Sequence, residues 1–118
     1  MRHIEDAEQT TLFKWAAFQS GKYPGLSLMF HIPNGGKRDA REAARFKAMG
    51  VKPGVPDILL PVARGGFHGL FIELKAPGGR VSRFQDGYIS ELREQGYRVE
   101  VCFGWEAAAA VVIQYLGE

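Results

Sequence analysis

Leu70-Phe71-Ile72-Glu73-Leu74-Lys75 is a short apolar stretch that contains one acid and one lysine. Residues two apart in a strand share a face, so Glu73 and Lys75 point to one side while the leucines and Ile72 point to the other. A lone buried charge is costly, and a buried carboxylate without a partner takes up a proton instead. The stretch therefore predicts a strand with one core face and one face whose charges need partners.

A second acid begins the preceding apolar stretch, Asp57-Ile58-Leu59-Leu60-Pro61. Pro56 favours extended backbone just ahead of it. Gly65-Gly66 is typical of a hairpin connection, after which the chain returns as the strand described above. Asp57 and Glu73 are therefore expected on neighbouring, paired strands.

Two carboxylates beside a lysine suit the hydrolysis of a phosphodiester. Mg²⁺ is usually held by one or two carboxylates together with waters and phosphate oxygens, and it lowers the pKa of a bound water. Lys75 would orient that water or stabilise the negative charge that develops at phosphorus. The simpler alternative is an ion pair between Lys75 and one of the acids.

A third acid is expected from the first helix of the chain. Glu8, Leu12 and Trp15 follow the spacing of one helix face, so Glu8 should lean inward. Glu5 is the competing candidate. An acid near the start of a helix is also favoured by the helix dipole alone, without any role in a site.

The remaining elements alternate between helices and strands and form one mixed α/β domain over residues 1–118. Asp39 and Ser82 are plausible helix caps, and Gly50 and Gly96 suit the positions after helix ends. The expected helices are Asp6–Gln19, Asp39–Met49, Ser82–Gln95 and Trp105–Leu116, and the further strands are Leu26–Ile32 and Arg98–Phe103.

The composition narrows the class of protein. A chain of 118 residues with 46% hydrophobic and 24% charged residues is close to globular averages, and its net charge is +2. Its single cysteine, Cys102, excludes an internal disulfide and is expected to be a buried, unreactive side chain. His31 has no second histidine at a metal-ligand spacing, so a structural role is expected for it. No signal peptide or membrane span is expected, which favours a reducing cytoplasm.

One segment of the chain is strongly basic. Between residues 37 and 52 there are six lysines or arginines and two acids. A charged helix face exposed to solvent explains such a run equally well when it is taken alone. The positive residues are Lys37, Arg38, Arg41, Arg45, Lys47 and Lys52.

Four motifs in a fixed order resemble the VRR-NUC family, the virus-type replication-repair nucleases of the PD-(D/E)xK superfamily. The motifs are Gly54-Val55-Pro56-Asp57, Phe71-Ile72-Glu73-Leu74-Lys75, Ser82-Arg83-Phe84-Gln85 and Gly96-Tyr97-Arg98-Val99. The likeness extends from Glu8-Gln9 to Tyr115-Leu116 and is more specific than any one motif.

The resemblance implies a restriction-endonuclease-like core, with a mixed central sheet flanked by helices. It implies that Asp57 and Glu73 bind the metal, that Glu8 is the helical acid, that Lys75 is the catalytic lysine and that Gln85 helps to organise the site. It further implies Mg²⁺ or Mn²⁺ dependence and a homodimer that cuts branched DNA such as four-way junctions, in a bacterial or phage-infected cell. A helicase or another replication-repair partner stays undetermined.

Within this interpretation the basic segment becomes a surface that contacts DNA phosphates, since backbone contacts give affinity without reading sequence. Its expected DNA-binding residues are Asn34, Lys37, Arg38, Arg41 and Arg45. Two other hypotheses stay open, a DNA-binding module with this fold but no catalysis, and a restriction-type enzyme that cuts linear duplex. The large partner domains of the family's eukaryotic repair nucleases are absent, which argues against exonuclease or flap-directed cleavage.

Overall fold

The computed structural model describes residues 2–33 and 39–117, and their helices and strands follow the alternation expected from the sequence. The helices are α1 (Arg2–Gln19), η1 (a short 3₁₀ helix, Pro24–Leu28), α2 (Ala40–Ala48), α3 (Arg83–Glu94) and α4 (Trp105–Gly117). The strands are β1 (Phe30–His31), β2 (Ile58–Leu60), β3 (Leu70–Lys75) and β4 (Arg98–Phe103).

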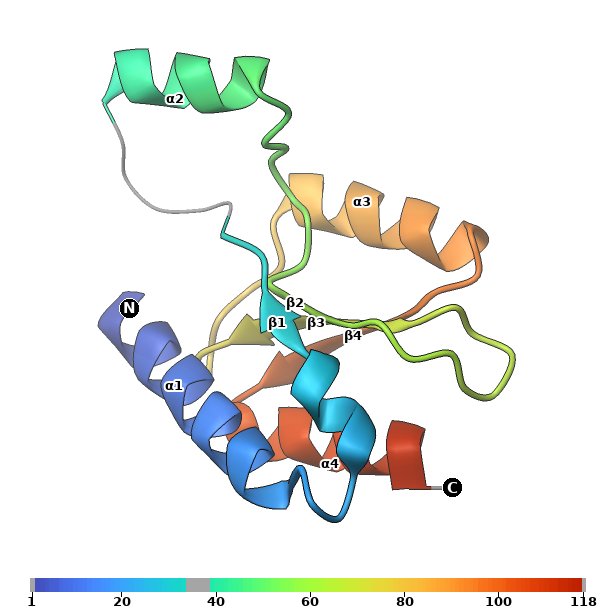
Figure 1. The fold of residues 1–118 in the computed structure, drawn as a ribbon. Coiled ribbons are helices and arrows are strands. Elements are labelled where there is room, and N and C mark those ends of the chain that lie inside the picture. Colours follow the sequence, from blue (N-terminus) through green and yellow to red (C-terminus); the bar gives the residue numbers. More distant parts are fainter. Residues whose placement is uncertain (1, 34–38, 118) are drawn as a thin grey trace.

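The four strands form one sheet in the order β1-β2-β3-β4. The β1–β2 and β2–β3 pairs are antiparallel, whereas β3 and β4 are parallel and are joined by α3. In Figure 1, α1 and α4 cover one face of the sheet and α3 covers the other. This is the mixed α/β architecture that the sequence predicts.

The core lies on both faces of β3. Leu70, Ile72 and Leu74 are buried with side chains from α1 and α4, including Leu12 and Ala16 of α1. On the opposite face, Phe71 packs with Ile89 of α3 and Val99 of β4. The expectation of one core face and one charged face is therefore only half right, because the face that bears Glu73 is also covered.

One predicted strand is wrong over most of its length. Residues 26–32 were expected to be extended, but Pro24 begins a 3₁₀ helix that ends at Leu28, and only Phe30 and His31 pair in the sheet. A proline at a helix start costs no hydrogen bond, because the first N–H groups of a helix have no partner in any case. Leu26 is buried in the core from this helix, which satisfies its apolar character without a strand.

The helix boundaries agree with the expected caps. Asp39 caps α2 through a hydrogen bond from the Glu42 N–H, and Ser82 caps α3. Gly50 and Gly96 adopt positive φ angles of 101° and 95° beyond the ends of these helices. The first helix starts earlier than expected, at Arg2 rather than Asp6. No helix in the described ranges is long and apolar enough to cross a membrane.

Cys102 should not react with a thiol reagent while the protein is folded. Its side chain is buried, and this burial, followed by the charge of Glu100, raises the thiol pKa to about 11. Because the thiolate is the reactive form, labelling by an Ellman-type reagent at pH 8 should require unfolding. Comparing the labelling rate with and without urea tests this, and rapid labelling in the absence of urea would contradict it.

Candidate metal and catalytic site

The pairing of β2 with β3 sets two carboxylates opposite each other. Ile58 is paired with Ile72 in an antiparallel register, so the residue before Ile58 faces the residue after Ile72. These residues are Asp57 and Glu73. Their side chains share one side of the sheet, as expected from the sequence, and they interact electrostatically.

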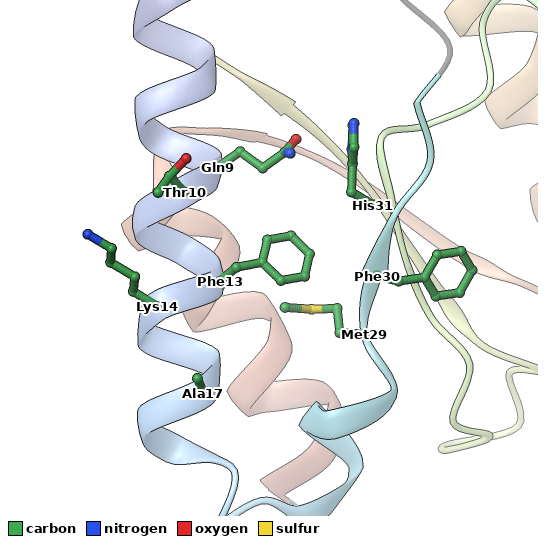
Figure 2. A pocket seen from close by; sticks show the side chains of 8 residues that line it. All are labelled: Gln9, Thr10, Phe13, Lys14, Ala17, Met29, Phe30 and His31. Carbon is green, nitrogen blue, oxygen red and sulfur yellow. The ribbon is translucent and has the colours of Figure 1, made fainter.

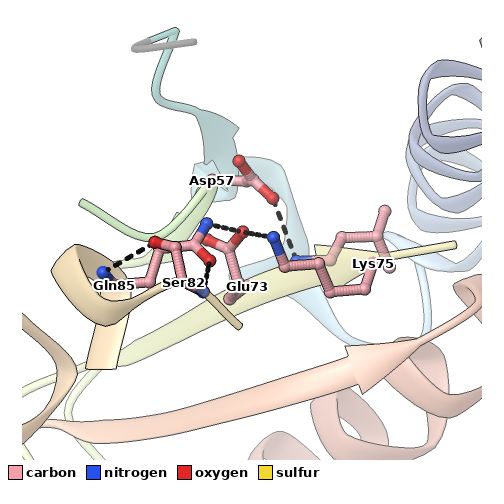
Figure 3. Close-up of polar contacts among 6 residues, drawn as sticks. Asp57, Glu73, Lys75, Ser82 and Gln85 are labelled. Atoms are coloured by element: carbon pink, nitrogen blue, oxygen red, sulfur yellow. Dashed lines mark hydrogen bonds and ion pairs between the residues drawn. The ribbon is translucent and has the colours of Figure 1, made fainter. Parts of the chain in front are cut away.

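Glu73 is almost completely buried, with 2% of its surface exposed. One carboxylate oxygen, Oε2, accepts a hydrogen bond from Gln85 Nε2 at 2.5 Å and forms an ion pair with Lys75 Nζ at 3.2 Å (Figure 3). The other oxygen, Oε1, is buried without a hydrogen-bond partner. A buried carboxylate oxygen that lacks a donor is unfavourable, so this atom fits a ligand that the protein alone does not supply.

Asp57 is fixed by the strands on either side of it. Its Oδ2 accepts a hydrogen bond from the Leu74 N–H at 3.0 Å, which ties the side chain to β3. Its backbone carbonyl accepts from the Ile32 N–H at 2.6 Å and lies 3.0 Å from His31 Nδ1. Asp57 is therefore held by backbone groups before any ligand binds.

The two carboxyl groups both hold their protons more tightly than isolated acids. Burial, followed by the charge of Asp57, raises the pKa of Glu73 from 4.5 to about 7, against the opposing effect of Lys75. Burial also raises the pKa of Asp57, and Glu5 adds to this, while the Leu74 hydrogen bond, His31 and Lys75 lower it. A divalent cation between the two groups would offset both the burial and the mutual repulsion.

Gln85 is held in position by the start of α3. Its Oε1 accepts from the Ser82 N–H at 2.8 Å, while Ser82 Oγ accepts from the Gln85 N–H at 3.1 Å, which is a capping box. With Oε1 used in this way, the amide Nε2 is directed at Glu73. The helix cap therefore fixes the donor that orients the buried carboxylate.

The loop before Asp57 packs closely against the same turn of α3. Gly54 has a φ of 87°, and a Cβ at this position would lie 2.6 Å from the carbonyl oxygen of Phe84. Only glycine satisfies both this backbone conformation and this close approach. The glycine of the Gly54-Val55-Pro56-Asp57 motif thus brings the Asp57 loop and the Gln85 turn together.

The two carboxylates fit a hard divalent cation with few protein ligands. Within residues 2–33 and 39–117, no group of three or more histidine, cysteine, aspartate or glutamate side chains is arranged to hold a metal ion. Mg²⁺ commonly takes one or two carboxylates and completes its shell with waters and phosphate oxygens. Asp57 and the partnerless Oε1 of Glu73 supply that donor set.

Glu8 is hydrogen-bonded to the start of α4. Glu8 Oε1 accepts a hydrogen bond from the Trp105 N–H at 2.7 Å, at the first turn of α4. This joins α1 to the positive end of the α4 dipole, and the predicted part of Glu8 in a metal site stays a prediction. The competing acid, Glu5, lies one turn earlier on α1 and contributes to the raised pKa of Asp57.

The basic helix α2 stands away from the sheet in Figure 1, and none of its residues is buried. Arg41, Arg45 and Lys47 are exposed on it. The other expected DNA-binding residues, Asn34, Lys37 and Arg38, lie outside the described residues. The exposed arginines are available for phosphate contacts, but they do not form part of the Asp57–Glu73 cluster.

His31 lies next to the site, although the sequence predicted only a structural role for it. It pairs with Ile58 across β1 and β2, which places its ring beside the Asp57 carbonyl. The search for a second histidine at a fixed spacing did not detect this contact. The signal that predicts it is the pairing of β1 with β2, which brings His31 beside Asp57, 26 residues later in the chain.

Comparison with known proteins agrees with this fold and these motifs. The family model described as "VRR-NUC domain" matches residues 5–105. A solved structure titled "VRR_NUC domain protein" superposes with a TM-score of 0.83 at 35% identity, covering 97% of this chain and 88% of that chain. No curated protein matches the sequence.

The fold and the match define a nuclease-type α/β domain. The chain belongs to the VRR-NUC family.

In the metal-free protein, the free energy of unfolding should fall as the pH rises from about 4.5 to about 7. Folded Glu73 keeps its proton up to about pH 7, whereas the value for an unperturbed glutamate is 4.5. Between these values the folded state binds more protons than the unfolded state, so raising the pH removes stability. Urea unfolding at a series of pH values in EDTA measures this slope.

Glu73→Gln should flatten most of the slope, because the titrating group is removed while its size is kept. Glu91→Gln, which changes an exposed acid of α3, is the matched control and should leave the slope unchanged. Equal slopes for the parent and Glu73→Gln would show that the burial of Glu73 does not control this titration.

Gln85→Ala should destabilise the protein more than Ser82→Ala does. Losing the Ser82 cap costs about 1 kcal/mol, as is typical for helix N-caps. Gln85→Ala removes a capping bond and also the Nε2 donor to Glu73 Oε2, which keeps only Lys75 as a partner. Losing a hydrogen bond to a charged group adds about 1.5–3 kcal/mol. Chemical denaturation of both variants at pH 8 measures the difference, and equal losses would refute the second role of Gln85.

Proposed function

We propose that this protein is a metal-dependent, structure-specific endonuclease that hydrolyses phosphodiester bonds in branched DNA such as four-way junctions. The observation that carries the proposal is the partnerless Oε1 of Glu73, buried beside Asp57 and Lys75. Membership of a nuclease family agrees with this chemistry. The expected metal is Mg²⁺ or Mn²⁺, bound by Asp57 and Glu73.

Each residue of the site has a separate task in this proposal. When bound, the metal ion would polarise the phosphodiester and lower the pKa of a bound water. Lys75, only 12% exposed, keeps its ammonium group at Glu73 and stabilises negative charge that develops at phosphorus. Gln85 holds the Glu73 carboxylate in one orientation, and the Leu74 N–H does the same for Asp57. Glu5 is the acid of α1 whose charge raises the pKa of Asp57.

The simple ion pair between Lys75 and an acid is also present, since Lys75 contacts Glu73 along the same strand. That pair uses only Oε2 of Glu73. The pair explains neither the buried Oε1 of Glu73 nor the presence of a second carboxylate, that of Asp57, opposite Glu73. The nuclease proposal uses all three groups, and for this reason we prefer it.

Binding of the branched substrate would depend on α2 and on a second copy of the chain. The exposed Arg41 and Arg45 of α2 are suited to phosphate contacts, which give affinity for any sequence. A homodimer would present two sites to a two-fold substrate. The same basic helix supports the second candidate function, DNA binding without cleavage.

The parent protein should cut a four-way junction only when Mg²⁺ or Mn²⁺ is added. Asp57→Asn, Glu73→Gln and Lys75→Met should each lower the cleavage rate about 100-fold or more, because each removes one charge at the reacting phosphate. Lys22→Met and Glu91→Gln, which change exposed residues away from the site, should retain the parent rate. Gel assays on linear, flap and junction DNA under single-turnover conditions measure these rates.

The panel also separates the alternatives. A protein that binds every DNA in a salt-sensitive manner and yields no product with either metal is a binding module. Cutting of linear duplex at one sequence, with junctions left intact, indicates a restriction-type enzyme. Cleavage by Lys75→Met at the parent rate would remove Lys75 from the mechanism.

A further inference from the structure

A groove of about 670 Å³ lies between α1 and β1, which is an edge strand of the sheet formed by the described residues. Figure 2 shows Phe13 of α1 and Met29, just before β1, directed toward each other across it. Gln9 extends its amide toward His31, while Lys14 points outward from the α1 side. The groove therefore combines an apolar floor with polar groups at one end, and Lys14 extends from the outer side of α1.

The groove leads to the candidate site through His31. His31 lines the groove and also lies 3.0 Å, through Nδ1, from the carbonyl oxygen of Asp57. The neighbouring Ile32 N–H donates to the same carbonyl. A ligand in the groove would thus lie next to the strand end that presents Asp57 to a phosphodiester.

The side chains of the groove suit an anion with an aromatic part. Lys14 and His31 are among the residues that line it, and no carboxylate is. An aromatic ring at Phe13 offers a stacking surface for a base, and glutamine is a common partner for base edges. The volume of the groove lies within the range of about 300–1,000 Å³ that is typical of small-ligand sites. A single nucleotide fits that range, whereas a stacked duplex does not.

We propose that this groove receives one unpaired nucleotide of the DNA substrate, adjacent to the bond that is cut. The base stacks on Phe13, the Gln9 amide contacts its edge, and Lys14, on the outer side of α1, contacts a phosphate of the adjoining backbone outside the groove. A base pair at a branch point has fewer stacked neighbours and opens more readily than a pair inside a duplex. The groove therefore contributes to selection of branched over linear duplex by receiving a nucleotide from an opened pair. This inference rests on the proposed function, because it concerns the substrate of the same site.

A peptide that binds as an additional strand fits this groove less well than a nucleotide does. Strand addition draws its affinity from a row of main-chain hydrogen bonds along an exposed edge. The edge strand β1 has only two residues, Phe30 and His31. That length offers few such bonds, and the lysine and histidine of the groove add no reason to select an extended peptide.

The test uses a four-way junction with one unpaired 2-aminopurine at the branch point, in EDTA so that no cutting occurs. Stacking in the groove should quench the 2-aminopurine fluorescence when the parent binds, and anisotropy of a distant dye reports total binding. Phe13→Leu, which keeps an apolar side chain, should abolish most of the quenching. Lys14→Ala should weaken binding about ten-fold, as expected for loss of a phosphate contact.

Matched controls come from the same part of the chain. Lys22→Ala removes an exposed lysine that does not line the groove, and Thr11→Ala changes an exposed residue beside Thr10 on α1. Both should bind and quench as the parent does. Gln9→Ala should reduce the differences in affinity among junctions that carry different unpaired bases. Circular dichroism of Phe13→Leu checks that it folds, and the surface variants Lys14→Ala and Gln9→Ala test the groove independently of Phe13.

The outcomes distinguish this inference from the proposed function. Cleavage of junctions with metal but no quenching in the parent, or groove variants that quench and bind as the parent does, would overturn the nucleotide groove alone. Quenching that depends on Phe13 and Lys14, without any metal-dependent cleavage, supports the groove and removes the endonuclease proposal. Absence of DNA binding by the parent would overturn both.

Discussion

The burial of Glu73 opposite Asp57 is the constraint on which the rest of the structure depends. Two carboxylates on paired strands repel each other, and a covered sheet face removes the water that would screen them. Burying such a pair disfavours the charged state, as the raised pKa of Glu73 reflects. A fold that retains this arrangement has to hold each carboxylate with specific donors, and the elements around β3 do so.

Those donors come from groups whose positions are set by secondary structure. The Leu74 N–H belongs to β3 itself, and the Gln85 amide is aligned by the capping box of α3. Gly54 allows the Asp57 loop to lie directly against that cap. The site is therefore built on rigid elements rather than on long side chains alone, which is what accurate positioning of a reacting phosphate requires.

The sequence predicted those parts of the site that depend on residues close together in the chain. The strand with Glu73 and Lys75, the pairing with Asp57 and the Ser82 cap all follow from alternation, turn residues and capping preferences. One error came from tertiary context. The strand expected at Leu26 is replaced by a 3₁₀ helix. A second consequence of tertiary context is a contact that the sequence did not predict, between Glu8 and the Trp105 N–H, 97 residues away in the chain. Helix spacing placed Glu8 on the inward face but could not tell which helix end it would meet.

The fold also separates the groups that we propose act on a phosphodiester from the exposed cations suited to holding DNA. The carboxylates and Lys75 lie where two covered strands meet, and their geometry is fixed by hydrogen bonds. The basic helix α2 stands outside that core with no buried residue, so its arginines can follow a phosphate backbone without disturbing the site. Affinity from exposed cations is general for nucleic acids and sensitive to salt. In the proposed nuclease, selectivity would have to arise nearer the carboxylates, where His31 of β1 connects the groove along α1 to Asp57.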